Sequence, residues 1–130
     1  MPPDKAFIRR CEGGLTHIDL SRTEWLRLIG AAPLIDLPCG DPPRERPFLY
    51  TAAVRMASAP TRPDEEDISI LRFVLKSLDA GQLDSLEDRL PPMLSALRRK
   101  KAPLPRAAGL YILKYAFGLP DRTPEGEIPC

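Results

Sequence analysis

The sequence predicts one α+β domain, in which a β-hairpin, a helix and a further strand pack on a C-terminal bundle of three to four helices. Three observations support this fold class. Apolar and polar residues alternate around a Gly-Gly pair near the N-terminus, a helix-capping motif follows directly, and helical spacing of apolar residues dominates the C-terminal half. The length of 130 residues suits a single domain, since domains commonly hold about 100–200 residues.

The predicted domain covers residues 1–130 and has three parts. Residues 6–63 hold the hairpin, the helix and the strand, with a proline-rich loop at 33–47. Residues 64–119 form the helical part, and residues 120–130 are expected to form an extended tail. The chain has 16 prolines, which cluster at 33–47, 60–63 and 103–105, so they separate elements of one domain.

Residues 6–20 are expected to form the β-hairpin, because Gly13-Gly14 suits the positive φ angles of a two-residue hairpin turn. In that register one face carries the apolar set Phe7, Cys11, Ile18 and Leu20. The other face carries the polar set Arg10, Glu12, His17 and Asp19. A slip of one residue would turn the apolar set toward water, so the separation of the two sets favours this register.

A helix is expected to follow the hairpin directly. Ser21 and Glu24 form a capping box, in which each side chain accepts a hydrogen bond from the other residue's backbone N–H. Apolar residues recur at positions i, i+3, i+4 and i+7 and so form one stripe along the helix: Trp25, Leu28, Ile29 and Ala32. Gly30 and Pro33 should end the helix.

Residues 48–56 are predicted to form the further strand, because this segment is rich in apolar and β-favouring residues. Its length and its Ala52-Ala53 pair also suit a helix. The choice between strand and helix stays open at this point.

Three segments of the C-terminal half have helical spacing. The first begins at Asp64 and ends near Ala80, with Gly81 as the residue after the C-cap. The second covers residues 84–101 and should kink or break at Leu90, because the Pro91-Pro92 pair removes two backbone donors and clashes with the preceding turn. A new helix would then begin at Pro91. The third covers residues 106–117.

No metal or other cofactor is expected. The only His, His17, and the three cysteines Cys11, Cys39 and Cys130 lack the close paired spacing of zinc ligands. An odd number of widely spaced cysteines favours a reducing compartment, and no apolar leader segment is visible, so a cytoplasmic location is expected. The longest apolar stretch, near residues 107–119, is too short to span a bilayer, so no membrane partner is expected.

No catalytic residues are assigned, and the chain is not expected to be an enzyme. Cys39 is the best candidate nucleophile, but nothing places the only His near it. Asp36 and Asp41 could form a carboxylate pair for acid–base chemistry. The acidic run at residues 64–67 is explained by the positive end of a helix macrodipole.

The distribution of charge along the sequence indicates a candidate binding surface. Residues 64–88 hold eight acidic and two basic residues, whereas residues 89–120 hold seven basic and no acidic ones. The candidate partner-binding residues are four at a predicted helix end and two in the proline-rich loop: Arg98, Arg99, Lys100, Lys101, Arg44 and Arg46. The first interpretation of the helix-end residues is that they only complement the helix macrodipole at a solvated end, ahead of a phosphate-binding patch or a docking surface for an acidic protein.

The leading functional hypothesis is a small, soluble, non-enzymatic interaction or regulatory protein that binds a larger protein or nucleoprotein. Small inhibitors of viral or mobile-element origin have this character. One alternative is a nucleic-acid-associated accessory protein that uses the basic helix end to contact phosphates. The other alternative is an enzyme of unknown reaction. The sequence does not specify an oligomeric state.

Overall fold

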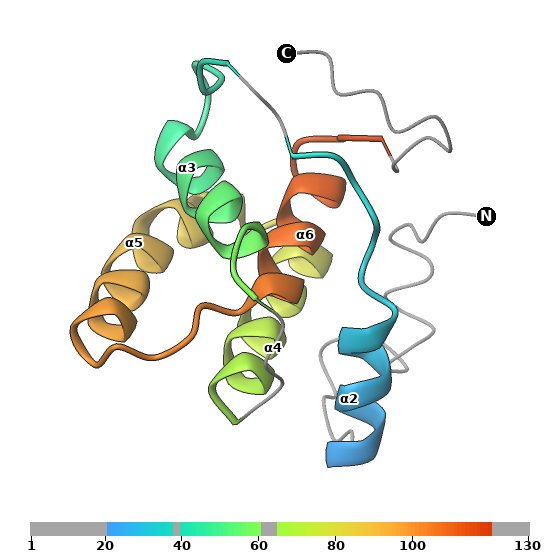
Figure 1. Ribbon diagram of the computed structural model, residues 1–130. Coiled ribbons are helices and arrows are strands. Elements are labelled where there is room, and N and C mark those ends of the chain that lie inside the picture. The colour runs from blue at the N-terminus through green and yellow to red at the C-terminus, as the bar shows by residue number, and fades with distance from the viewer. Residues whose placement is uncertain (1–20, 38–39, 61–64, 121–130) are drawn as a thin grey trace.

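A computed structural model describes residues 21–37, 40–60 and 65–120, and these residues form helices and no strand. In chain order the helices are α2 (Arg22–Gly30), α3 (Pro47–Ala57), α4 (Glu65–Ala80), α5 (Leu83–Arg99) and α6 (Arg106–Tyr115) (Figure 1). The α+β prediction is therefore wrong for the described part of the chain. The hairpin predicted at 6–20 and most of the predicted tail lie outside the described residues.

The segment predicted as a strand at 48–56 is helix α3. Pro47 occupies its first turn, where a proline removes no intrahelical hydrogen bond. The buried side chains follow helical rather than alternating spacing, and they are Leu49, Ala52, Ala53, Met56 and Ala57. Burial of this stripe outweighs the local β preference of residues such as Tyr50 and Thr51, because β propensity is a weak effect that packing readily overrides.

Helix α6 lies at the centre of the helical assembly, against α3 and α4 (Figure 1). Every residue from Ala107 to Leu113 is buried. At the crossing with α3, a Cβ atom on Gly109 would lie 2.5 Å from the Ala53 carbonyl oxygen and 2.5 Å from the Ala57 nitrogen. The two backbones can approach this closely only because position 109 has no side chain.

Helix α5 is continuous through Pro91 and Pro92, so the predicted break at Leu90 is wrong. Four buried leucines lie on one side of the helix, two before the prolines and two after them: Leu86, Leu90, Leu94 and Leu97. Burial of these side chains on both sides of the prolines stabilises the continuous helix and offsets the missing hydrogen bonds.

Helix α2 begins with the predicted capping box. The Ser21 N–H donates to Glu24 Oε1 at 3.0 Å, and the Glu24 N–H donates to Ser21 Oγ at 3.2 Å. Hydrogen bonds to the Glu24 carboxylate, first from the Ser21 backbone N–H and then from the Ser21 side chain, lower the pKa of that carboxyl. Helix α2 packs on the others through its buried Trp25, Leu28 and Ile29. The Tyr111 hydroxyl adds a hydrogen bond to the Leu28 carbonyl oxygen at 3.4 Å, and Arg22 forms an exposed ion pair with Glu65.

Candidate functional site

An open groove with a volume of about 310 Å³ separates part of α3 from part of α5. Helix α3 contributes one face to it, with Phe48, Thr51, Ala52 and Arg55. Helix α5 contributes the other, with Pro91, Leu94, Ser95 and Arg98. On both helices these residues span eight positions, or about two turns. We call this feature the α3–α5 groove.

The floor and one lip of the groove are apolar. Ala52 and Leu94 are buried at its base, and the ring of Pro91 is half-buried beside them. Phe48 forms the lip, with 66 % of its surface exposed. An exposed phenylalanine beside a concave apolar floor is a common feature of interaction surfaces.

Two guanidinium groups flank the groove, one from each helix. Arg55 and Arg98 are both exposed, and neither forms an ion pair with another described residue. Arg98 was among the residues that the sequence singled out, and the structure places it in the same groove as Arg55. Both guanidiniums are therefore available to carboxylates or phosphates of a ligand.

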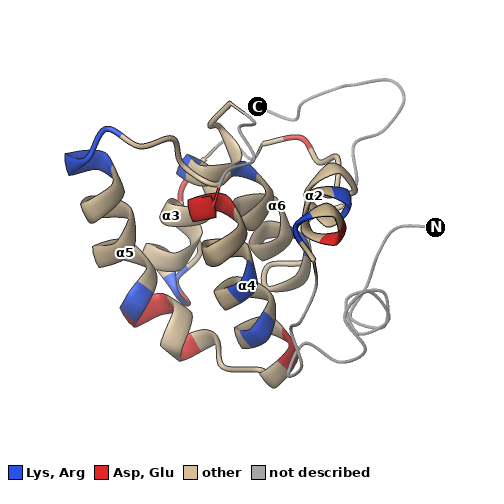
Figure 2. Cartoon of the chain, turned by 90° about the horizontal axis from the view of Figure 1, so that it is seen from below, with Lys and Arg blue, Asp and Glu red and all other residues tan. Residues whose placement is uncertain are grey.

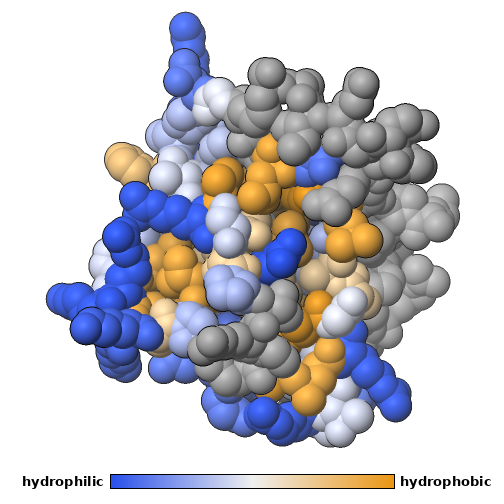
Figure 3. Space-filling view, in the orientation of Figure 1, coloured by the Kyte–Doolittle hydropathy of each residue, from blue (hydrophilic) through white to orange (hydrophobic). Residues whose placement is uncertain are grey.

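The basic end of α5 extends from this groove. Arg98 and Arg99 lie in the last turn, Lys100 is the C-cap, and all four residues from Arg98 to Lys101 are exposed. Figure 2 shows this basic end opposite the acidic residues of the first turns of α5. In Figure 3, hydrophilic side chains gather at the lower left, where Figure 1 places the end of α5, with hydrophobic ones directly beside them.

The end of α5 has a lysine at a position that favours glycine. Lys101 has a φ of 56°, and the Ala102 N–H donates to the Leu97 carbonyl oxygen at 2.9 Å, which is a Schellman motif. Helix α4 ends in the same motif, with Gly81 at a φ of 70° and a Gln82-to-Ser77 hydrogen bond of 2.8 Å. A left-handed lysine costs about 1 kcal/mol relative to glycine. The chain thus keeps a positive charge at this end at a cost in stability.

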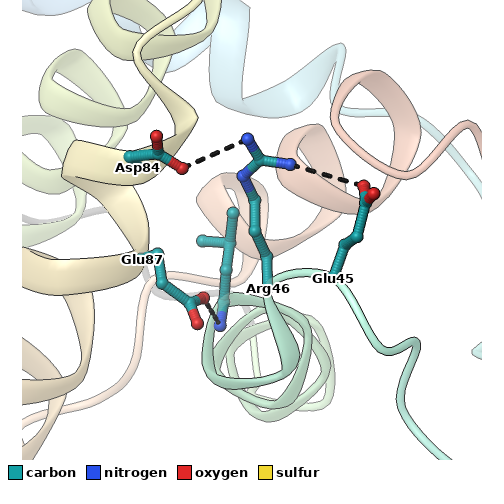
Figure 4. A network of polar contacts seen from close by, with 5 residues as sticks. Glu45, Arg46, Asp84 and Glu87 are labelled. Carbon is teal, nitrogen blue, oxygen red and sulfur yellow. Dashed lines mark hydrogen bonds and ion pairs between the residues drawn. The ribbon is translucent and has the colours of Figure 1, made fainter.

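The two candidate residues of the proline-rich loop have different surroundings. Arg44 is exposed. Arg46 is the N-cap of α3, with a φ of 51°, and its guanidinium lies 3.2 Å from Asp84 Oδ1 and 3.8 Å from Glu45 Oε2 (Figure 4). Because Asp84 lies in the first turn of α5, Arg46 joins the start of α3 to the start of α5. The role of Arg46 in partner binding stays a prediction, in addition to its observed contacts with Asp84 and Glu45.

Glu87 adds a second link between the starts of α3 and α5 (Figure 4). Its Oε2 accepts a hydrogen bond of 2.6 Å from the backbone N–H of Leu49, one of the first N–H groups of α3. Helix α3 has no capping hydrogen bond from its own N-cap side chain. The Glu87 carboxylate of α5 therefore acts as the capping acceptor. These contacts close one end of the interface between the two helices and leave the groove beyond them open.

The described candidate catalytic residues, Asp36 and Asp41, lie outside the α3–α5 groove. His17, Cys11, Cys39 and Cys130 lie outside the described residues. Asp36 is half-buried and Asp41 is exposed. In residues 21–37, 40–60 and 65–120, no group of three His, Cys, Asp or Glu residues could hold a metal ion.

Sequence reasoning missed Phe48, Arg55 and Pro91 as members of the site. The signal for the first two was available, because a helical reading of residues 48–56 puts Phe48 and Arg55 seven positions apart on one face. Their placement opposite Pro91 and Arg98 depends on how α3 packs on α5, which no local pattern predicts.

Comparisons with known proteins gave no family for the chain. A scan against protein-family models, a search of curated proteins and a search of solved structures each returned no match. Of the helices in the described residues, none has the length and apolar character needed to cross a membrane. The function is therefore argued from the groove itself.

Proposed function

We propose that this protein is a non-enzymatic interaction or regulatory protein that binds a protein partner through the α3–α5 groove and the adjoining basic end of α5. The observation that carries the proposal is the exposed Phe48 above an apolar floor, with Arg55 and Arg98 beside it. Aromatic and arginine side chains dominate the binding energy of many protein interfaces. By covering a surface of its partner, such a protein would act as an inhibitor or a regulatory subunit.

The chemistry of the lining supports binding rather than catalysis. The described residues around the groove supply two guanidiniums and two hydroxyls, those of Thr51 and Ser95, together with apolar surface. General acid–base catalysis would need a carboxylate, an imidazole, an amine, a phenol or a thiol within hydrogen-bonding reach of a substrate. The described lining offers none of these groups.

The left-handed Lys101 is a second support. Glycine would relieve the backbone strain at this position, as it does at the end of α4. A strained residue that persists on the surface suggests a use for its side chain. The charge of Lys101 adds to that of Arg98, Arg99 and Lys100 and would attract an acidic partner from a distance.

The alternative function is association with nucleic acid through the same basic end. Four consecutive basic residues favour it, because phosphate contacts come mainly from Arg and Lys. The formal net charge of only +1 gives it little general support. Binding of a generic DNA duplex at low salt that disappears when residues 98–101 become alanine would favour this alternative.

The proposed function is tested by affinity capture from the native host with matched variants. We expect the full chain and the Leu34→Ala control to capture the same protein, and Phe48→Ala and Arg98→Glu to lose it. Leu34 is a suitable control because it is as exposed as Phe48, at 68 % against 66 %, and lies outside the groove. Capture that is equal for all four proteins would contradict the proposal.

A further inference from the structure

We infer that the α3–α5 groove binds an acidic amphipathic helix, in which a bulky apolar side chain enters the groove and nearby carboxylates contact Arg55 and Arg98. The inference rests on the proposed function and names the chemistry of its partner. Three features of the described residues support it: the shape of the groove, the nature of its walls and the placement of its charges.

The shape of the groove suits a few inserted side chains. Its volume of about 310 Å³ is at the lower end for ligand sites, which commonly hold about 300–1,000 Å³. The residues that line it cover about two helical turns on each wall, or about 10 Å along a helix axis. A helix laid along the groove would present side chains at positions i, i+3 or i+4, and i+7 over the same length.

The walls of the groove exclude pairing with an extended strand. Both walls are helices, α3 and α5, whose backbone N–H and C=O groups bond within each helix. An extended peptide gains its main affinity by hydrogen bonding to the free edge of a sheet. The described residues form no strand and so offer no such edge at the groove. Recognition of a helix through its side chains needs no such edge.

The charges lie at one end of the groove. Arg55 follows Leu49 along α3 and Arg98 follows Glu87 along α5, and Leu49 and Glu87 contact each other. Both arginines therefore come from the parts of their helices that lie beyond that contact. Arg99, Lys100 and Lys101 continue the positive charge in the same direction along α5. Carboxylates of the partner should contact this end, and its apolar anchor should contact Phe48 and Pro91.

A nucleic acid would satisfy only part of this surface. Phosphates could bind Arg55 and Arg98, but the apolar floor of Ala52 and Leu94 would gain nothing from a polar backbone. A helix with both an apolar anchor and carboxylates matches the floor and the charges together. The observations therefore favour an acidic protein segment over DNA or RNA.

The test is a selection from displayed amphipathic helical peptides of about 15 residues, or about four turns. The full chain serves as bait, and Ser95→Trp, which fills the groove from its exposed rim, serves for counter-selection after circular dichroism has confirmed its helix content. We expect enriched peptides to carry a bulky apolar residue with Asp or Glu within one turn of it. Absence of enrichment, or enriched peptides without carboxylates, would overturn the inference.

The best synthetic peptide then identifies the residues that contact it. We expect Arg55→Gln and Arg98→Gln each to weaken its binding about tenfold, as expected for the loss of a charge pair in a partly desolvated site. Arg27→Gln, which removes an exposed charge in the last turn of α2 outside the groove, should leave binding unchanged. Equal binding by all three variants would overturn the inference, and so would displacement of the peptide by a random DNA duplex at low salt.

The two proposals can fail separately. If the groove variants lose a captured protein while no acidic helix is selected, the proposed function stands and the nature of the ligand is wrong. If acidic helices bind the groove but the captured proteins do not depend on Phe48, the chemistry of the groove stands and its proposed use in the cell is wrong.

Discussion

The two sides of helix α3 are packed in opposite ways. Toward α6, alanines and Gly109 allow the backbones to touch, and no space is left between the helices. Toward α5, contacts at the N-terminal end hold the helices together, and beyond them larger side chains surround an open groove. The comparison suggests that one side of α3 supplies stability and the other supplies recognition.

The largest expected effect is that of Gly109→Ala, at the side of α3 that packs on α6. The new Cβ would meet backbone atoms of Ala53 and Ala57 at 2.5 Å, so the two helices must move apart. We expect the free energy of unfolding to fall by about 3 kcal/mol, at the upper end for overpacked cores. Urea unfolding followed by circular dichroism measures this change.

Gly30→Ala is the matched control for that experiment. A Cβ at Gly30 meets nothing within 4 Å, and this residue ends α2 with no positive φ. We expect the control to be neutral or to stabilise the fold by about 0.5 kcal/mol. A loss at Gly109 no greater than that at Gly30 would show that the α3–α6 contact is not as tight as described.

The next largest effect is that of Phe48→Ala, at the side of α3 that lines the α3–α5 groove. Since the ring is mostly exposed, its removal should change the free energy of unfolding by no more than about 0.5 kcal/mol. Its effect on binding should be about 2 kcal/mol, or roughly 30-fold in Kd, if Phe48 is a central contact. Calorimetric titration with the captured partner or the selected peptide measures the second quantity. A large loss of stability with unchanged binding would reverse the roles of the two sides.

A smaller effect is expected at the contact that joins the starts of α3 and α5. Glu87→Ala removes the acceptor for the Leu49 N–H, and we expect it to lower the free energy of unfolding by about 1 kcal/mol, as for the loss of a helix cap. Glu87→Gln keeps an acceptor oxygen and should lose less than half of that. Equal losses for the two variants would assign the effect to charge rather than to the hydrogen bond.

The smallest effect is expected at Lys101, and its sign is opposite. Lys101→Gly removes a left-handed lysine and should raise the free energy of unfolding by about 0.5–1 kcal/mol. The same change should slow association with an acidic partner at low salt, because one steering charge is lost. Gly81→Lys, at the equivalent position of α4, should destabilise the fold by about 1 kcal/mol. A stabilised Lys101→Gly variant with unchanged association would show that the charge has no use there.

Some elements were predictable because their signals are local. The capping box of Ser21 and Glu24 and the left-handed Gly81 depend on neighbours within a few residues, and both are present as predicted. The exposed basic end of α5 was also predictable from a local signal, the run of four basic residues at 98–101. Phe48 and Arg55 were missed because the same residues suit a strand or a helix until α6 is placed against them.

The sequence by itself determined where α2 begins and where α4 ends, because a capping box and a left-handed glycine act within one or two turns. It also determined the switch from acidic to basic residues along the C-terminal half. Only the tertiary structure decided that residues 47–57 are a helix and that α5 continues through two prolines. In both cases burial of a stripe of apolar side chains against distant residues outweighed a local preference. The α3–α5 groove was also decided only by the tertiary structure, because it forms where two helices distant in sequence pack together.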